Sequence, residues 1–276
     1  MKLEAGGIEV SYELSGKGAS LVLIHGFTDN STMWYNQVPV FSERFKVLAY
    51  DVRGHGKTKT PEGGFSMELF ADDVHALLRA LGIEKACMLG YSMGGRIALQ
   101  FALEYPEMTT GLVFANSGVM GPDVEPTEEK VAELAERRKQ MVEMFETGQI
   151  EVIADGMAVR SFSPGFRDED PVAFQKYKDV KLQNDPRHYL AIMQAMVQAV
   201  TNPPDLRRLE CPGLIIAGDR DSFMTVDEAK SMERAISDVT VTILPTGHAA
   251  AIEAPQAFNQ AVLDFMDRVS SPPVFS

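Results

Sequence analysis

Cysteine, tryptophan and histidine are scarce in this chain, whose 276 residues include two, one and five of them respectively. Two cysteines cannot form a disulfide framework. Because Cys87 and Cys211 fall in or beside predicted buried strands, we expect both to be reduced core thiols. No cysteine or histidine pair shows the spacing of a zinc site. The sequence therefore predicts no metal site.

Basic residues are also in short supply, with 26 Lys and Arg against 39 Asp and Glu, for a formal net charge of −13. Nucleic acids and anionic membrane surfaces require a basic footprint, so this balance argues against both as general partners. No apolar stretch approaches the length of a membrane span, and residues 1–7 lack the apolar core of a signal peptide. We expect a soluble, cytoplasmic protein with a small-molecule partner. The sequence carries no signature of its oligomeric state.

What the chain does contain is an alternation of apolar, strand-like runs with helical patterns. This alternation is typical of βαβ units and predicts an α/β fold, with a mostly parallel, twisted sheet flanked by helices. The predicted strands are Ile8 to Leu14, Leu21 to Ile24, Lys46 to Tyr50, Ala86 to Leu89, Leu112 to Ala115, Leu214 to Gly218 and Val239 to Leu244. The first two, separated by Gly16-Lys17-Gly18, are expected to form an antiparallel edge.

Ser92 lies in the segment Gly90-Tyr91-Ser92-Met93-Gly94-Gly95, between the strand-like run that ends at Leu89 and a helical pattern from Arg96. A serine at the tip of a tight strand-to-helix turn needs neighbours without side chains, and Gly90 and Gly94 meet that need. The helix that follows directs free N–H groups and its positive dipole end toward negative charge beside the serine. The pattern alone is weak evidence, because it also arises by composition.

A histidine and an aspartate follow in the order that such a serine requires. His248 comes shortly after the last predicted strand, and Asp219 and Asp221 follow the strand before it. A serine hydroxyl becomes a nucleophile when a neutral imidazole takes its proton, and a carboxylate orients that imidazole. The order Ser, Asp, His matches one of the common arrangements of a serine triad.

Four motifs together resemble the α/β-hydrolase superfamily, in particular serine esterases and enol-lactonases: His25-Gly26-Phe27-Thr28, Asp51-Val52-Arg53-Gly54-His55-Gly56, the turn around Ser92, and Gly247-His248. The resemblance implies a Ser92–His248–Asp221 triad, because Gly218-Asp219-Arg220-Asp221 follows the family's Gly-x-x-Asp pattern, and Asp219 is the alternative acid. The other acid position known in the family holds Asn116. The resemblance also implies an oxyanion hole formed by the backbone N–H groups of Phe27 and Met93, and no cofactor.

The character of the chain changes between residues 123 and 201, where it becomes charged, helical and rich in methionine. We interpret this part as an all-helical cap inserted into the core, so that residues 1–121 and 203–276 form the core and residues 122–202 the cap. Its periodic segments run from Thr127 to Thr147 and from Pro186 to Val200. Tyr91, Met144 and Met193 are the candidate pocket residues. The alternative is that the methionines only pack the cap onto itself.

Other polar motifs are interpreted as structural. Gly54-His55-Gly56-Lys57-Thr58 lacks the first glycine of a phosphate-binding loop, since that position holds Asp51. Asp51, Arg53 and His55 are expected to stabilise the turn after their strand, and His25 to shape the oxyanion loop. Arg96 is expected to form a surface ion pair and to have no role in substrate binding.

The sequence thus predicts a serine hydrolase of small carboxylic esters or lactones, acting through an acyl-enzyme. Hydrolysis of carbon–carbon bonds in ring-cleavage products uses the same triad, but the chain departs from those enzymes at Phe27-Thr28-Asp29 and at Ala249. A cofactor-free perhydrolase is a further alternative. A ligand receptor on the same fold is the alternative outside enzymes, and repeated turnover would distinguish the two classes.

Overall fold

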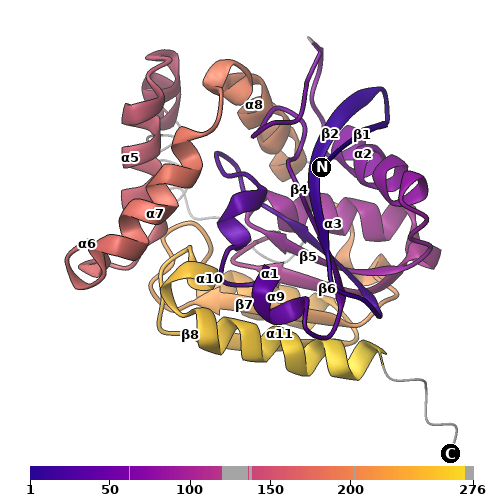
Figure 1. Cartoon of the computed structure of the whole chain (residues 1–276). Helices are drawn as coiled ribbons and strands as arrows, with labels where there is room; N and C mark the ends of the chain where they lie inside the picture. The colour runs from indigo at the N-terminus through magenta and orange to yellow at the C-terminus, as the bar shows by residue number, and fades with distance from the viewer. Residues whose placement is uncertain (62, 120–135, 137–138, 202, 271–276) are drawn as a thin grey trace, which may run out of the picture.

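An eight-stranded, mostly parallel sheet forms the centre of the computed structural model (Figure 1), which describes residues 1–61, 63–119, 136, 139–201 and 203–270. The strand order is β1-β2-β4-β3-β5-β6-β7-β8, and the pairs from β4 to β8 are parallel. The strands are β1 (Lys2–Ala5), β2 (Ile8–Ser15), β3 (Ser20–Ile24), β4 (Lys46–Tyr50), β5 (Ala86–Tyr91), β6 (Thr109–Ala115), β7 (Gly213–Gly218) and β8 (Val239–Leu244). The α/β fold expected from the sequence is confirmed.

The antiparallel edge is present, but its expected strand pairing is wrong. β2 pairs antiparallel with β1 and with β4, and β4 separates it from β3. β3 is a continuous apolar run whose side chains are buried, as suits an interior parallel strand, whereas β2 has exposed and half-buried polar positions. The hairpin between β1 and β2 turns at Gly6 and Gly7, which both have positive φ, as a two-residue hairpin turn requires.

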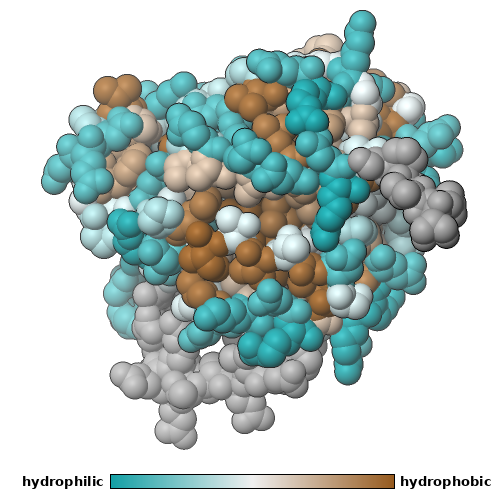
Figure 2. All heavy atoms as spheres, turned by 90° about the horizontal axis from the view of Figure 1, so that it is seen from below, coloured by the Kyte–Doolittle hydropathy of each residue, from teal (hydrophilic) through white to brown (hydrophobic). Residues whose placement is uncertain are grey.

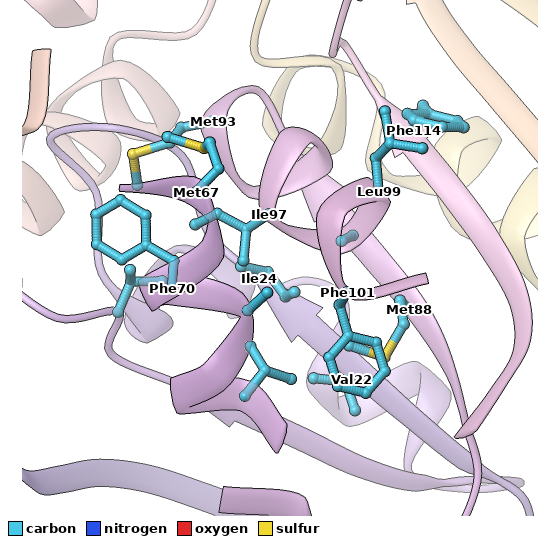
Figure 3. Packing of buried hydrophobic residues seen from close by; sticks show 14 of the residues in the cluster. Val22, Ile24, Met67, Phe70, Met88, Met93, Ile97, Leu99, Phe101 and Phe114 are labelled. Atoms are coloured by element: carbon cyan, nitrogen blue, oxygen red, sulfur yellow. The ribbon is translucent and has the colours of Figure 1, made fainter. Parts of the chain in front are cut away.

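Helices cover both faces of the sheet. Those on one face are α2 (Met67–Ala80), α3 (Met93–Glu104) and α9 (Val226–Ala235), and those on the other are α1 (Val38–Phe41), α10 (Ala250–Glu253) and α11 (Pro255–Ser270). In α2, Phe70, Val74 and Leu77 are buried at helical spacing, and Ser66 caps the first turn. Figure 3 shows side chains of α2 and α3 directed toward Val22 and Ile24 of β3. Seen from below, the molecule is mostly hydrophilic with an apolar area at the centre of the view (Figure 2).

A group of helices follows β6 and precedes β7 in the chain. We call residues 139–201 the helical insertion; residues 139–146 are helical, and its further helices are α5 (Ile150–Ser161), α6 (Phe166–Glu169), α7 (Pro171–Leu182) and α8 (Tyr189–Thr201). Short 3-10 turns are η1 (Ser31–Trp34), η2 (Pro106–Met108), η3 (Pro186–His188) and η4 (Leu206–Arg208). In Figure 1 the helices α5, α6 and α7 lie together at the left, apart from α11. The start of the helix expected from Thr127, the proposed boundary near residue 121 and residues 271–276 lie outside the described residues.

The first turn of α3 lies in direct backbone contact with two strands. A Cβ atom added at Gly94 would lie 2.2 Å from the carbonyl oxygen of Ile24, and one added at Gly90 would lie 2.1 Å from the carbonyl oxygen of Gly94. Real Cβ atoms do not approach backbone oxygen atoms so closely. Only glycine at these positions allows α3 to start where it does.

We expect Gly94→Ala to lower the free energy of unfolding by at least about 2 kcal/mol, because α3 must move away from β3 to make room for the methyl group. Gly64→Ala is the matched control, since a Cβ atom there meets no atom within 4 Å, and we expect a change within about 0.5 kcal/mol. Urea unfolding followed by circular dichroism compares the two variants. Equal midpoints for Gly94→Ala and wild type would contradict the close contact.

Candidate active site

The side chains expected to react all follow strands in one half of the sheet. Ser92 follows β5, Asp221 follows β7 and His248 follows β8, and β6 separates β5 from β7 in the sheet. The carboxyl ends of parallel strands meet at one edge. Successive strands are placed to opposite sides of β3, and ligands of open α/β sheets bind at such a reversal of strand order. Topology alone therefore brings these three residues to one crevice.

Ser92 sits in a strained backbone conformation, with φ 52° and ψ −116°. Two hydrogen bonds hold it there: its N–H donates to the carbonyl of Ala115 at 3.0 Å, and its own carbonyl accepts from the Ser117 hydroxyl at 2.7 Å. Left-handed φ values are uncommon outside glycine and cluster at functional sites. The surrounding structure therefore holds the Ser92 side chain at the tip of the turn.

A chain of hydrogen bonds joins Ser92, His248 and Asp221. His248 Nε2 lies 2.9 Å from Ser92 Oγ, and His248 Nδ1 lies 2.8 Å from Asp221 Oδ2 and 3.0 Å from Oδ1. Because an ionised carboxylate only accepts, Nδ1 carries the hydrogen in the neutral ring, and the lone pair of Nε2 faces the serine hydroxyl. The arrangement is suited to removing the hydroxyl proton of Ser92.

The carboxylate of Asp221 is buried and well supplied with donors. Oδ1 accepts the N–H groups of Phe223 and Met224 at 2.7 and 3.1 Å, and Oδ2 accepts the Asn116 amide at 3.1 Å. Burial alone would raise the pKa of Asp221, but His248 and these donors outweigh it and hold the pKa below its usual value. The group is therefore ionised at neutral pH and stabilises positive charge on the imidazole.

The alternative acid positions lie in different surroundings. The Asp219 side chain is 47% exposed and pairs with Arg220. Asn116, at the family's second acid position, donates its amide both to Asp221 and to the carbonyl of Gly247 at 3.2 Å. An amide cannot carry the charge, but at this place it links the acid to the loop that bears His248. The sequence offers no local sign of this bond, because the three residues are far apart in the chain.

The backbone N–H groups of Phe27 and Met93 lack an acceptor within the described part of the chain. Met93 is the first residue of α3, so its N–H has no partner within the helix. Phe27 follows β3, next to Thr28, whose φ is 67°. Phe27 lines the cavity that Ser92 also lines, and Met93 follows Ser92 directly.

A buried ion pair fixes the loop after β3. Lys181 Nζ of α7 lies 2.6 Å from Asp29 Oδ1 and also donates to the Thr28 hydroxyl and to Tyr177 Oη, at 3.2 and 3.1 Å. Both charged side chains are 1% exposed. Asn184 adds a bond from its amide to the carbonyl of Thr28 at 3.0 Å. The helical insertion is thus tied directly to the loop that carries the Phe27 N–H.

A cavity of about 360 Å³ opens over Ser92 and His248. Its apolar lining comes from both the core and the helical insertion and consists of Phe27, Tyr91, Met141, Met157, Met193, Met196, Val197 and Phe223. The polar side chains that line it are Asp29, Ser92, Arg96, Arg160, Ser161, Tyr177, Lys181 and His248. A site of this size accepts a small organic molecule with one end at the serine.

Of the three candidate pocket residues, Tyr91 and Met193 line the cavity and Met144 does not. The expectation for Met144 is therefore wrong. Its sulphur packs against α5, where a Cβ atom added at Gly156 would lie 2.7 Å from it. Met141, three residues earlier and about 60° away around the helix axis, lines the cavity instead.

Arg96 also differs from expectation. It lies one helical turn after Ser92, is half-buried, lines the cavity, and forms no ion pair within the described residues. The expected surface ion pair is wrong, because the helix that starts at the serine turn carries residue 96 into the crevice. Phe223, Met157 and Lys181 are further cavity residues that local patterns in the sequence do not reveal.

The residues interpreted as structural have structural contacts. His25 accepts the N–H of Val52 on Nε2 at 2.9 Å, and burial lowers its pKa. Asp51 accepts the N–H groups of Ser31 and Lys57 at 2.9 and 2.8 Å. Arg53 forms a buried ion pair with Asp73. These contacts shape the loops around the crevice and leave His248 as the histidine beside Ser92.

Among the described residues there is no cluster of three or more His, Cys, Asp or Glu side chains that could hold a metal ion. The helices in that part of the chain are likewise too short or too polar to cross a membrane. Cys87 and Cys211 are free thiols, and burial raises the pKa of Cys211 to about 11.

A family model described as the alpha/beta hydrolase fold matches residues 19–255. The chain belongs to this α/β-hydrolase family. The 3-oxoadipate enol-lactonase 2 of Acinetobacter baylyi is 30% identical to it over 268 residues, which cover 96% of each chain. The 2-hydroxy-6-oxo-6-(2'-aminophenyl)hexa-2,4-dienoic acid hydrolase of Metapseudomonas resinovorans is 26% identical over 96% of this chain and 90% of its own.

A solved structure of an esterase is also similar to this chain. The thermophilic esterase of Thermogutta terrifontis, described with malate bound, superposes with a TM-score of 0.87 and 27% identity, and the match covers 98% of this α/β-hydrolase and 100% of the esterase. Relatives that are lactonases, esterases and hydrolases support hydrolase activity for this chain.

We expect Asp221→Asn to lower kcat by about 10⁴-fold in this α/β-hydrolase, because an amide that faces Nδ1 favours the wrong tautomer of His248. Asp219→Asn is the matched control and should keep more than about a tenth of the wild-type kcat, a loss under about 1.4 kcal/mol. Both are measured with 4-nitrophenyl acetate on variants shown to be folded. If Asp219→Asn were the inactive variant, the acid would be misassigned.

Proposed function

We propose that this α/β-hydrolase cleaves small carboxylic esters or lactones through an acyl-enzyme, with Ser92 as nucleophile, His248 as base and Asp221 as its orienting acid. The observation that carries the proposal is the unbroken hydrogen-bond chain from Ser92 Oγ to Asp221 beneath a largely apolar cavity. The sequence relatives named as a lactonase and the structural relative named as an esterase support the same reaction class.

In the first half of the reaction, Ser92 Oγ attacks the carbonyl carbon of the ester while its proton passes to His248 Nε2. The carbonyl oxygen becomes an oxyanion that accepts the N–H groups of Phe27 and Met93, and each such donor contributes about 3 kcal/mol to stabilising the transition state. The buried carboxylate of Asp221 stabilises the imidazolium. Collapse of the tetrahedral intermediate breaks the bond to the alkoxy group, which leaves with the proton from His248.

In the second half, a water molecule gives its proton to His248 Nε2 and attacks the acyl carbon. The same two N–H groups stabilise the second oxyanion. The bond from the acyl carbon to Ser92 Oγ then breaks, the serine takes the proton back, and the carboxylic acid leaves. With a lactone, the alcohol released in the first half stays covalently part of the acyl group. No step needs a cofactor.

The helical insertion serves as a cap over this site and determines which acyl groups fit. Met141, Met157, Met193 and Met196 contribute to the cavity from the insertion, whereas the reacting groups come from the loops of the core. We therefore divide the chain into a core of residues 1–121 and 203–276 and a cap of residues 122–202. In this proposal the core carries the reacting groups and the cap selects the substrate.

We expect Ser92→Ala to lower hydrolysis of 4-nitrophenyl acetate by at least about a thousandfold, because the residues of a triad act as one unit. A fluorophosphonate reagent should label the wild type once, on the peptide that contains Ser92. The wild type should also turn over many times per molecule, which a ligand receptor does not. A folded Ser92→Ala variant with wild-type activity would overturn the mechanism.

We expect Met193→Ala to shift the preferred acyl group toward longer chains, since each further methylene buried in the enlarged cavity contributes about 0.8 kcal/mol, or about fourfold in kcat/KM. Met144→Ala is the matched control and should leave the profile unchanged, because Met144 packs on α5 outside the cavity. The measurement is kcat/KM for 4-nitrophenyl esters from acetate to octanoate. Identical profiles for Met193→Ala and wild type would show that the cap does not determine acyl length.

A further inference from the structure

Two guanidinium groups line the cavity without a carboxylate partner among the described residues, those of Arg96 and Arg160. Arg160 of α5 is half-buried and donates to the neutral amide oxygen of Gln140 at 2.9 Å. Arg96 of α3 is half-buried and makes neither an ion pair nor a side-chain hydrogen bond in the described part of the chain. This pattern is unexpected in a chain with 39 acidic residues and a formal net charge of −13.

The acidic groups near the cavity already have partners. Asp29 is paired with Lys181, and Asp221 with His248. Glu228 of α9 is the acid whose charge raises the pKa of Arg96. Its carboxylate already accepts the N–H of Thr225 at 2.6 Å, in the capping box of its own helix. Glu68 borders a neighbouring hollow that Arg96 also lines, and the two form no ion pair. Neither arginine therefore forms an ion pair with a carboxylate of the described residues.

Arg96 is placed to reach a molecule that is bound at Ser92. It is the fourth residue of α3, which begins directly after Ser92, and the side chains of Ser92 and Arg96 line the same cavity. Side chains in a helix lean toward its N-terminus, which here is the serine. Burial lowers the pKa of Arg96, so an anion that enters the cavity would replace lost hydration.

We propose that Arg96 binds a free carboxylate of the substrate while Ser92 attacks the ester or lactone carbonyl at the other end of the same molecule. The substrate class is then an anionic ester or lactone whose carboxylate and scissile carbonyl are separated by a short carbon chain. Arg160 of α5 also lines the cavity and adds positive potential there. This inference rests on the proposed hydrolase function and deepens it.

The test compares two probes of equal shape and different charge, mono-4-nitrophenyl glutarate and 4-nitrophenyl 5-methylhexanoate. We expect the wild type to prefer the anionic ester, and Arg96→Met to lower the ratio of kcat/KM for the anionic over the neutral ester by about 10- to 100-fold, as expected for loss of a hydrogen bond to a charged group. Arg96→Lys, which keeps the charge without the planar fork, should give an intermediate ratio.

Arg79→Met is the matched control, because Arg79 is exposed on α2 outside the cavity, and it should leave the ratio unchanged. If the wild type hydrolyses both esters and Arg96→Met keeps the wild-type ratio, the carboxylate site is overturned and the hydrolase proposal stands. If the wild type hydrolyses neither ester nor any lactone, the hydrolase proposal itself fails.

A measurement on the wild type alone covers the case in which Arg96→Met does not fold. Glutarate should inhibit hydrolysis of 4-nitrophenyl 5-methylhexanoate competitively, at a concentration at least about tenfold lower than its neutral analogue glutaramide does. Inhibition by both at the same concentration would overturn the carboxylate site, whatever the behaviour of the variants.

Discussion

The backbone contact between the first turn of α3 and the strands beneath it is the constraint on which the rest of the site depends. Gly90 and Gly94 make that contact possible, and it forces Ser92 into its left-handed conformation. The same contact leaves the Met93 N–H at the helix start without an acceptor in the described residues and brings Arg96 over the crevice one turn later. One packing requirement thus accounts for the positions of the proposed nucleophile, of one proposed oxyanion donor and of the proposed carboxylate site.

The predictable parts of the structure are those that local sequence determines. Strand runs bounded by glycine and proline give the α/β fold. Ser92, Asp221 and His248 each come shortly after the end of such a run, so topology brings them together. The position of β4 between β2 and β3 depends on which strand is buried on both faces, and the spacing of the two first strands does not encode that.

The composition of the cavity is less predictable, because its contacts join segments that are far apart in the chain. Periodicity identifies a methionine-rich helix but not how that helix is turned about its own axis. The sequence therefore does not show that Met144 packs on α5 while Met141 lines the cavity. Arg96 looks like a surface residue in a helical pattern, but the start of α3 places it beside the crevice, where Met193 and Met196 of the insertion line the same cavity. From the sequence, Asn116 is only a position where the family can carry the acid. The structure shows that its amide donates to Asp221.

The Lys181–Asp29 pair limits how this enzyme can diversify. A buried carboxylate left without its ammonium partner costs several kcal/mol of stability. Replacing the insertion with unrelated helices would remove Lys181 and leave Asp29 unpaired in the loop after β3. Replacements at Met193 and Met196 of α8 change the lining of the cavity and leave the ion pair between α7 and Asp29 intact. A chimera that receives a foreign set of helices would need a neutral residue at position 29 as well.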